Sequence, residues 1–106
     1  MTYATVYTRS GSYEGFEVSG HSGYGQEGND VVCAAISALV INTVNSIEKF
    51  TGTKFSVEED EEAGRIAVKI LSKPDEGCEL LIKSMLLGLE DVSKSHGHLM
   101  IKYKEV

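Results

Sequence analysis

Hydrophobic and polar positions alternate along five short segments of the chain, as they do in β-strands. These segments are rich in β-branched and aromatic residues, and their ranges are 3–8, 13–19, 54–59, 65–71 and 99–104. The Ser10-Gly11-Ser12 break predicts a hairpin turn between the first two strands, and the acidic stretch from Glu58 to Gly64 predicts a turn between the next two. The pattern therefore predicts two hairpins and a final single strand.

Two longer segments carry apolar residues at helical spacing. The first helix should begin after Asp30, an N-cap residue type, and run to about Phe50. Its apolar residues extend well around the helix axis, which predicts a deeply buried helix that is also available to a subunit interface. The second helix should open at Asp75 and end near Ser95, with Gly97 as its C-terminal stop.

The order of the elements is β-β-α-β-β-α-β, with no linker or low-complexity segment between them. A length of 106 residues suits one compact core, so we assign residues 1–106 to a single domain. Strand-helix-strand units favour helices packed on a sheet. We therefore predict an α/β fold of the α+β type, with two helices on a mixed sheet.

The charge balance narrows the classes of partner. Ten basic and sixteen acidic residues give a net charge of -6, which disfavours binding to nucleic acid and favours a basic protein. We see no signal peptide and no run of about 18 apolar residues, so we expect a cytoplasmic location and no membrane contact. Cys33 and Cys78 are far apart in the sequence and should remain thiols.

Cys33 lies just behind Asp30, near the predicted start of the first helix. The dipole of the helix favours a thiolate there, although it contributes only about 0.3–1 kcal/mol. His21, across a glycine-rich loop, is the candidate base that takes the thiol proton. The free N–H groups of the helix start, including that of Cys33, are candidate donors to an oxyanion.

Cys33 and Asp30 can also be explained by purely structural roles. Free cysteines are among the most buried residue types, and Asp30 can serve as a helix cap. By spacing alone, an inert core cysteine is the better supported reading of Cys33. A carboxylate beside a thiolate would also disfavour the thiolate, unless Asp30 instead orients His21.

The run "GHSGYGQEGNDVVCAAIS" changes this balance because it resembles the signature of the bacterial ribosomal-processing cysteine protease family, Prp. That signature is roughly Gly-His-Ala, a loop, Gly-x-Asp, one or two apolar residues, then Val-Cys-Ala-Ala-x-Ser. The matching residues are Gly20, His21, Gly28, Asp30, Val32, Cys33, Ala34, Ala35 and Ser37. The chain departs from the pattern at Ser22, where alanine is more usual.

The resemblance implies a homodimeric cysteine protease with Cys33 as nucleophile and His21 as general base. It implies that the substrate is a large-subunit ribosomal protein, from which a short N-terminal extension is removed. We give Asp30 and Ser37 supporting roles, Asp30 as a helix cap first and as an orienting group for His21 second. The predicted substrate-binding loop comprises Gly20, Ser22, Gly23, Tyr24, Gly25 and Gly28, and we expect it to close over bound peptide.

The remaining motifs say less about function. The acidic stretch Glu58 to Glu62 could steer a basic protein, but a solvated hairpin is the simpler reading. His96, His98 and Cys78 match no standard zinc spacing, so we predict surface histidines, a core cysteine, no metal and no cofactor. The alternative function is a non-catalytic ribosome-associated module that binds a basic ribosomal protein without cutting it.

Overall fold

Five strands form one mixed sheet in the computed structural model, which describes residues 1–20 and 29–106. The strands are β1 (Thr2–Arg9), β2 (Ser12–Ser19), β3 (Phe55–Asp60), β4 (Arg65–Ile70) and β5 (Leu99–Glu105). Their order across the sheet is β3-β4-β2-β1-β5. The β1–β5 pair is parallel and the other three pairs are antiparallel, so the prediction of a mixed sheet is confirmed.

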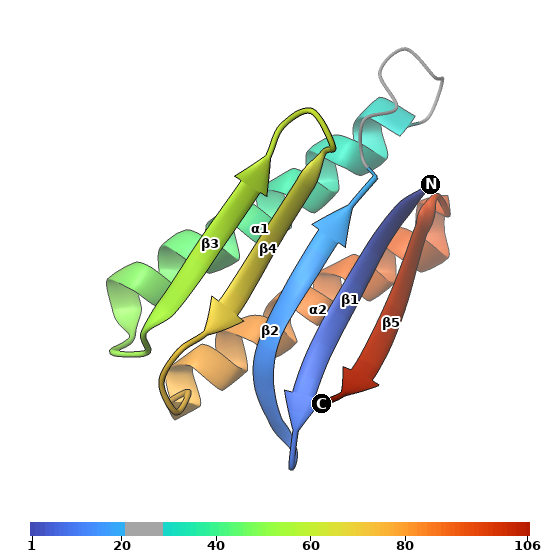
Figure 1. The fold of residues 1–106 in the computed structure, drawn as a ribbon. Helices are drawn as coiled ribbons and strands as arrows, with labels where there is room; N and C mark the ends of the chain where they lie inside the picture. Colours follow the sequence, from blue (N-terminus) through green and yellow to red (C-terminus); the bar gives the residue numbers. More distant parts are fainter. Residues whose placement is uncertain (21–28) are drawn as a thin grey trace.

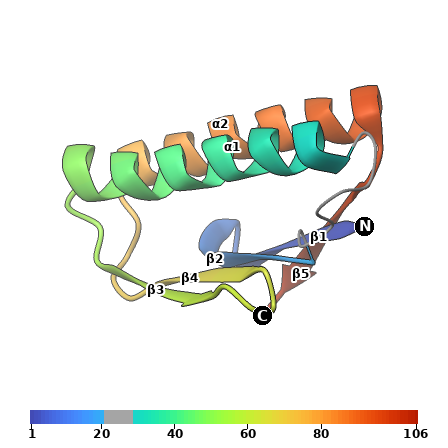
Figure 2. The same cartoon turned by 90° about the horizontal axis from the view of Figure 1, so that it is seen from above.

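Both helices, α1 (Asn29–Phe50) and α2 (Glu76–His96), cover the same face of the sheet and leave the other face open (Figures 1 and 2). The predicted order β-β-α-β-β-α-β is therefore confirmed. In Figure 1 the start of α1, the end of β2 and the β3–β4 turn lie at one end of the molecule. Segments that are distant in the sequence thus lie at the same end of the molecule.

The boundaries follow from local chemistry. Ser10 and Gly11 both have positive φ, as the two central residues of a tight hairpin turn require. Asp75 precedes α2 and its carboxylate accepts a 2.8 Å hydrogen bond from the Cys78 N–H, while Gly97, with φ of 70°, ends the helix as predicted. The acidic stretch is shorter as a turn than predicted, because β3 continues to Asp60.

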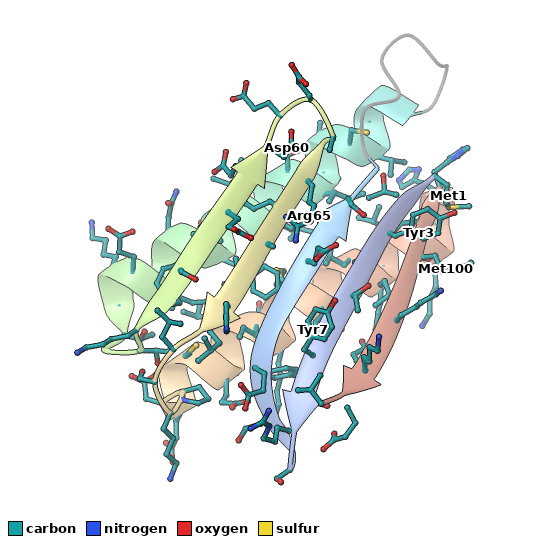
Figure 3. The ribbon with its side chains drawn as sticks, in the orientation of Figure 1. Met1, Tyr3, Tyr7, Asp60, Arg65 and Met100 are labelled. Carbon is teal, nitrogen blue, oxygen red and sulfur yellow. The ribbon has the colours of Figure 1, made fainter. Side chains whose placement is uncertain are left out.

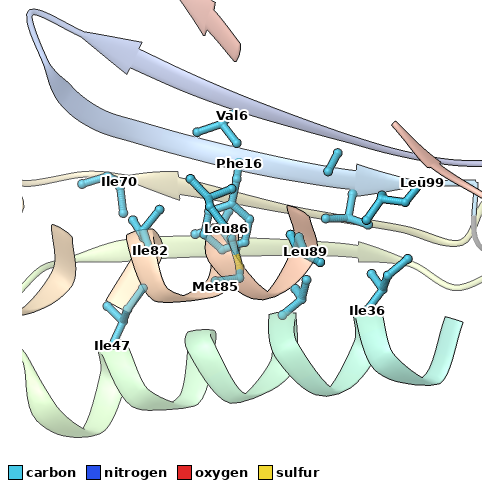
Figure 4. Packing of buried hydrophobic residues seen from close by; sticks show 14 of the residues in the cluster. Val6, Phe16, Ile36, Ile47, Ile70, Ile82, Met85, Leu86, Leu89 and Leu99 are labelled. Carbon is cyan, nitrogen blue, oxygen red and sulfur yellow. The ribbon is translucent and has the colours of Figure 1, made fainter. Parts of the chain in front are cut away.

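The core lies between the helices and the sheet. Its largest fully buried side chains are Phe16, Ile36, Ile47, Ile82 and Leu89 (Figure 4). Each such side chain stabilises the fold by about 1.5–3 kcal/mol relative to an exposed position. The alternation seen in the sequence is therefore the signature of a sheet with one buried face.

The start of α1 differs from the prediction. The helix begins at Asn29, so Asp30 is inside its first turn instead of preceding it as a cap. Asn and Asp are both common at helix starts, and the sequence did not distinguish the two positions. Cys33 becomes the fifth helical residue, and the regular helical pattern pairs its N–H with the carbonyl of Asn29. The Cys33 N–H is thus not among the free donors, contrary to the expectation.

Residues Val31–Phe50 of α1 are long and apolar enough to cross a membrane, by length and composition alone. Core helices of water-soluble proteins pass the same test, and here one side of α1 packs in the core through Ile36 and Ile47. Its outward side carries exposed apolar residues, including Val31 and Ile41. The length and apolar composition of α1 therefore reflect one buried side and one apolar outer side.

Candidate active site

Cys33 is half-buried in the second turn of α1. The start of α1 lies at the same end of the molecule as the end of β2 and the β3–β4 turn (Figure 1). Val32 and Ile36 on the same helix are each only 1% exposed and fix this turn in the core. A cysteine on a rigid turn with part of its surface accessible can meet a substrate. Cys33 is therefore more accessible than a fully buried core cysteine.

Gly20 is the residue at which β2 leaves the sheet toward the predicted base. Its φ is 87°, a conformation that L side chains rarely adopt, and its backbone lies against the Met1 carbonyl. The predictions made for His21, Ser22, Gly23, Tyr24, Gly25 and Gly28, and for the side chain of Asp30, lie outside what the structure describes. Gly20 and Cys33 are thus the two signature positions whose placement frames the site.

Ser37 lies one helical turn beyond Cys33 and lines a cleft of about 500 Å³. We call this the hairpin cleft, because it lies between α1 and the β3–β4 hairpin. Its lining residues are Val18, Ile36, Ser37, Val40, Ile41, Glu59, Asp60, Glu61, Gly64, Arg65 and Ile66. The floor is apolar, and three acidic residues, Glu59, Asp60 and Glu61, are among the lining residues. The predicted supporting position Ser37 therefore lies one helical turn from Cys33 and also lines this cleft.

Arg65 is the cation among these lining residues, and its guanidinium is already paired. It donates a 3.0 Å hydrogen bond to Glu17 and lies 3.8 Å from Glu58. Figure 3 shows Arg65 at the β3–β4 end of the sheet, and the strand register places it with Glu17 and Glu58 on the open face. Hydrogen bonding by Glu17 and its negative charge raise the pKa of Arg65. Among the described residues, the ion pairs of Arg65 therefore join it to Glu17 and Glu58 and not to Glu59.

The residues considered for zinc are not gathered in the structure. Cys78 is fully buried at the start of α2, whereas His96 and His98 are exposed at its other end. His96 follows Cys78 by eighteen positions of the helix, which is about 27 Å along its axis. The predicted surface histidines and core cysteine are confirmed. Burial is also the main reason that the pKa of Cys78 is raised.

Comparison with known proteins decides between a cysteine protease and a non-catalytic binding module. The sequence profile of the cysteine protease Prp family matches residues 1–101. The chain belongs to this family. The resemblance seen in the sequence is therefore confirmed, and the Prp family is a family of cysteine proteases, which makes the chain a cysteine protease.

Curated relatives of the Prp family support this assignment. A ribosomal processing cysteine protease of Staphylococcus aureus is 25% identical over 88 residues, which cover 82% of this chain and 83% of that protein. The Bacillus subtilis protein of the same name is 27% identical over 85 residues, or 76% of each chain. Both alignments span most of the two chains. The likeness therefore concerns the whole fold and not one motif.

Solved structures agree with the fold. A Streptococcus mutans protein is 33% identical and superposes with a TM-score of 0.89 over 100% of this chain and 99% of that one. The S. aureus Prp protease, in complex with a substrate peptide, is 21% identical and superposes with a TM-score of 0.90 over 98% of this chain and all of that one. The predicted sheet with two helices is thus the fold of the Prp family.

Sequence reasoning missed the hairpin cleft. Its walls come from β2, α1, β3 and β4, and no local pattern brings these segments together. One signal was available, because Glu59 occupies a strand position where the alternation calls for an apolar residue. That signal needed the strand register to be interpreted.

Proposed function

We propose that this cysteine protease removes a short N-terminal extension from a large-subunit ribosomal protein, with Cys33 as nucleophile and His21 as general base. The observation that carries the proposal is the half-buried Cys33 in the second turn of α1, one helical turn before Ser37, which lines the hairpin cleft. Two curated relatives are named ribosomal processing cysteine proteases, and one S. aureus structure holds a covalently linked product peptide. These relatives support both the chemistry and the class of substrate.

The reaction follows from the thiol and the imidazole. His21 takes the proton of the Cys33 thiol, and the thiolate attacks the scissile carbonyl to form a tetrahedral intermediate. The imidazolium returns that proton to the leaving amine as the peptide bond breaks, which leaves a thioester on Cys33. Water, deprotonated by His21, then hydrolyses the thioester and frees the enzyme.

The backbone at the start of α1 supplies the electrostatic stabilisation. In a helix that begins at Asn29, the N–H groups of Asn29, Asp30 and Val31 have no partner within the helix. These groups and the positive end of the dipole are the donors we assign to the developing oxyanion. Because Asp30 is inside the helix, its proposed role is to orient His21, with Ser37 supporting the site one turn beyond Cys33.

The loop that carries Gly20, Ser22, Gly23, Tyr24, Gly25 and Gly28 is proposed to bind the substrate backbone. Glycines allow a peptide to approach closely, as binding of extended chains requires. We further propose that the enzyme acts in the cytoplasm without cofactor, metal, nucleic acid or membrane, as expected for a processing enzyme of ribosomal proteins.

We propose a homodimer formed through the outer sides of the helices. Leu80 and Leu87 lie on one side of α2, seven residues apart, and are 66% and 72% exposed. Two such residues on one helix face are typical of a surface that is covered in an assembly. Light scattering of Leu87→Glu should then report a monomer where the native protein is a dimer, and a native monomer would contradict the dimer.

The decisive experiment uses a peptide that spans the N-terminal extension of the ribosomal protein from the same organism. Mass spectrometry should find it cut by the native protein and left intact by Cys33→Ala and His21→Ala. Binding by all three proteins without cleavage would instead support the non-catalytic binding module. Circular dichroism of the variants controls for loss of fold.

A further inference from the structure

The hairpin cleft has an apolar floor, and its lining on α1 begins three residues after the proposed nucleophile, Cys33. Val18, Ile36, Val40 and Ile66 are the apolar residues at its base, and Ile41, which is 53% exposed, borders it. The lining residues of α1 follow Cys33 by three to eight positions, which is about 5–12 Å along the helix axis. A peptide bound at Cys33 would therefore pass close to the cleft.

Glu59 occupies an unusual position in this cleft. It pairs with Ile66, and Ile66 pairs with the core residue Val18, so all three lie on the side of the sheet that faces the helices. The preceding residues on this row of β3 are Phe55 and Val57. A carboxylate thus replaces the apolar side chain that the alternation requires, and it lines the cleft.

Within the described part of the chain, the charge of Glu59 is not balanced by the cation that lines the cleft. Arg65 is paired with Glu17 and Glu58 on the opposite face of the sheet. Asp60 is used inside the turn, where it accepts a 3.1 Å hydrogen bond from the Ala63 N–H. Glu59 therefore offers its carboxylate to a positively charged group that enters from solvent.

We propose that the hairpin cleft is a specificity subsite for one lysine or arginine side chain of the substrate. The aliphatic stem packs on the apolar floor, and the charged head pairs with Glu59. Since an extended peptide advances about 3.3 Å per residue, this basic residue lies about two to four residues from the cleaved bond. This inference rests on the proposed function and names a residue that decides which peptides are cut.

The test measures kcat/KM for peptides that differ at one position. A lysine is placed two, three or four residues on either side of the scissile bond, and each peptide has a matched version with glutamine there. We expect one position at which the native enzyme prefers lysine, and Glu59→Gln should reduce that lysine-to-glutamine ratio about threefold to tenfold. Glu59→Lys should invert the preference toward a peptide with glutamate at that position.

Glu62→Gln is the matched control, because Glu62 belongs to the same acidic stretch and does not line the cleft. It should leave the lysine-to-glutamine ratio within about twofold of the native value. Equal effects of Glu59→Gln and Glu62→Gln would overturn the subsite, since they would reflect only the overall negative field. A ratio of one at every position would overturn it as well.

A binding measurement separates this inference from the proposed reaction. Fluorescence anisotropy with Cys33→Ala should show the same preference for the lysine peptide, and Cys33→Ala combined with Glu59→Gln should lose it. Cleavage without any lysine preference would support the proposed protease reaction and contradict the subsite. If binding shows a lysine preference that depends on Glu59 but the native protein cuts no peptide, the subsite is supported and the proposed reaction is contradicted.

Discussion

Gly20 lies directly against the backbone of Met1. A Cβ atom built on Gly20 would be 2.8 Å from the Met1 carbonyl oxygen, closer than side chains approach backbone in proteins. The φ of Gly20 is also 87°. Glycine is therefore required here twice, by conformation and by contact, at the last described residue before His21.

Gly20→Ala should consequently impair the site as well as the fold. We expect a loss of kcat/KM of at least about tenfold, because the strand end must shift and the following residue moves with it. Gly11→Ala is the matched control, since Gly11 has φ of 83° but no atom within 4 Å of an added Cβ. Gly11→Ala should cost about 1–2 kcal/mol of stability through strain and leave kcat/KM nearly unchanged. Equal activity of the two variants would contradict this role of Gly20.

The two cysteines should differ sharply in reactivity. Cys33 is half-buried, whereas Cys78 is fully buried and its pKa is raised, mainly by that burial. Iodoacetamide at neutral pH should therefore modify Cys33 at least about 100-fold faster, because Cys78 becomes accessible only when the chain opens. Peptide mapping by mass spectrometry measures both rates. Comparable rates would mean that α2 does not protect Cys78.

Asp75 connects the start of α2 with the segment that follows α1. Its carboxylate accepts hydrogen bonds from the N–H groups of Cys78 and Gly52, at 2.8 and 3.1 Å. These bonds, the one from Cys78 foremost, lower its pKa from 3.8. A lowered pKa stabilises the fold above that value, and the stabilisation is lost as the pH falls below it.

Asp75→Ala should thus lower Tm by about 4–8 °C at pH 7. The difference from the native protein should shrink when the melting curves are repeated in increasingly acidic buffer. Asp91→Ala, an exposed aspartate later in the same helix, is the comparison and should change Tm little. A difference that is constant with pH would show that the charge of Asp75 contributes nothing.

Tyr103 on β5 donates a 2.6 Å hydrogen bond to Glu90 on α2. Burial, followed by this bond and the charge of Glu90, raises the pKa of Tyr103 to about 12. Because the pKa is raised, the stabilisation is complete below the ordinary value of 10.0 and is lost as the pH rises from there toward 12.

Tyrosinate absorbance during an alkaline titration should accordingly contain a last component that disappears in Tyr103→Phe. Tyr103→Phe should also lose less stability than the native protein between those two pH values. Tyr3→Phe, on the open face of the sheet, should retain the last component (Figure 3). Its persistence in Tyr103→Phe would assign it to another tyrosine.

The elements could be predicted because each has a local signal. Ser10 and Gly11 marked the first turn, Asp75 marked the start of α2, and Gly97 marked its end. The family signature then singled out Cys33, for which spacing alone favoured a place in the core. Both kinds of information lie in short runs of sequence, so both were accessible without a structure.

The hairpin cleft could not be predicted, since it depends on strand order. Val18, Ile36 and Ile66 meet only because β2 pairs with β4 and α1 crosses above them. Glu59 was assigned to a solvated turn, and it is indeed exposed. Only the register with Ile66 shows that it faces the helix side of the sheet. Local charge patterns do not contain that relationship.

The parallel pairing of β1 with β5 joins the first strand of the chain to the last one. Thr2 donates to the His98 carbonyl and Val106 donates to the Thr8 carbonyl, so the pair is fastened at both ends. During synthesis, the edge of β1 that pairs with β5 therefore stays unpaired until residues 99–105 have left the ribosome. Because β5 follows the other four strands and both helices in the sequence, the sheet of the newly made enzyme can close only after all of them have been translated.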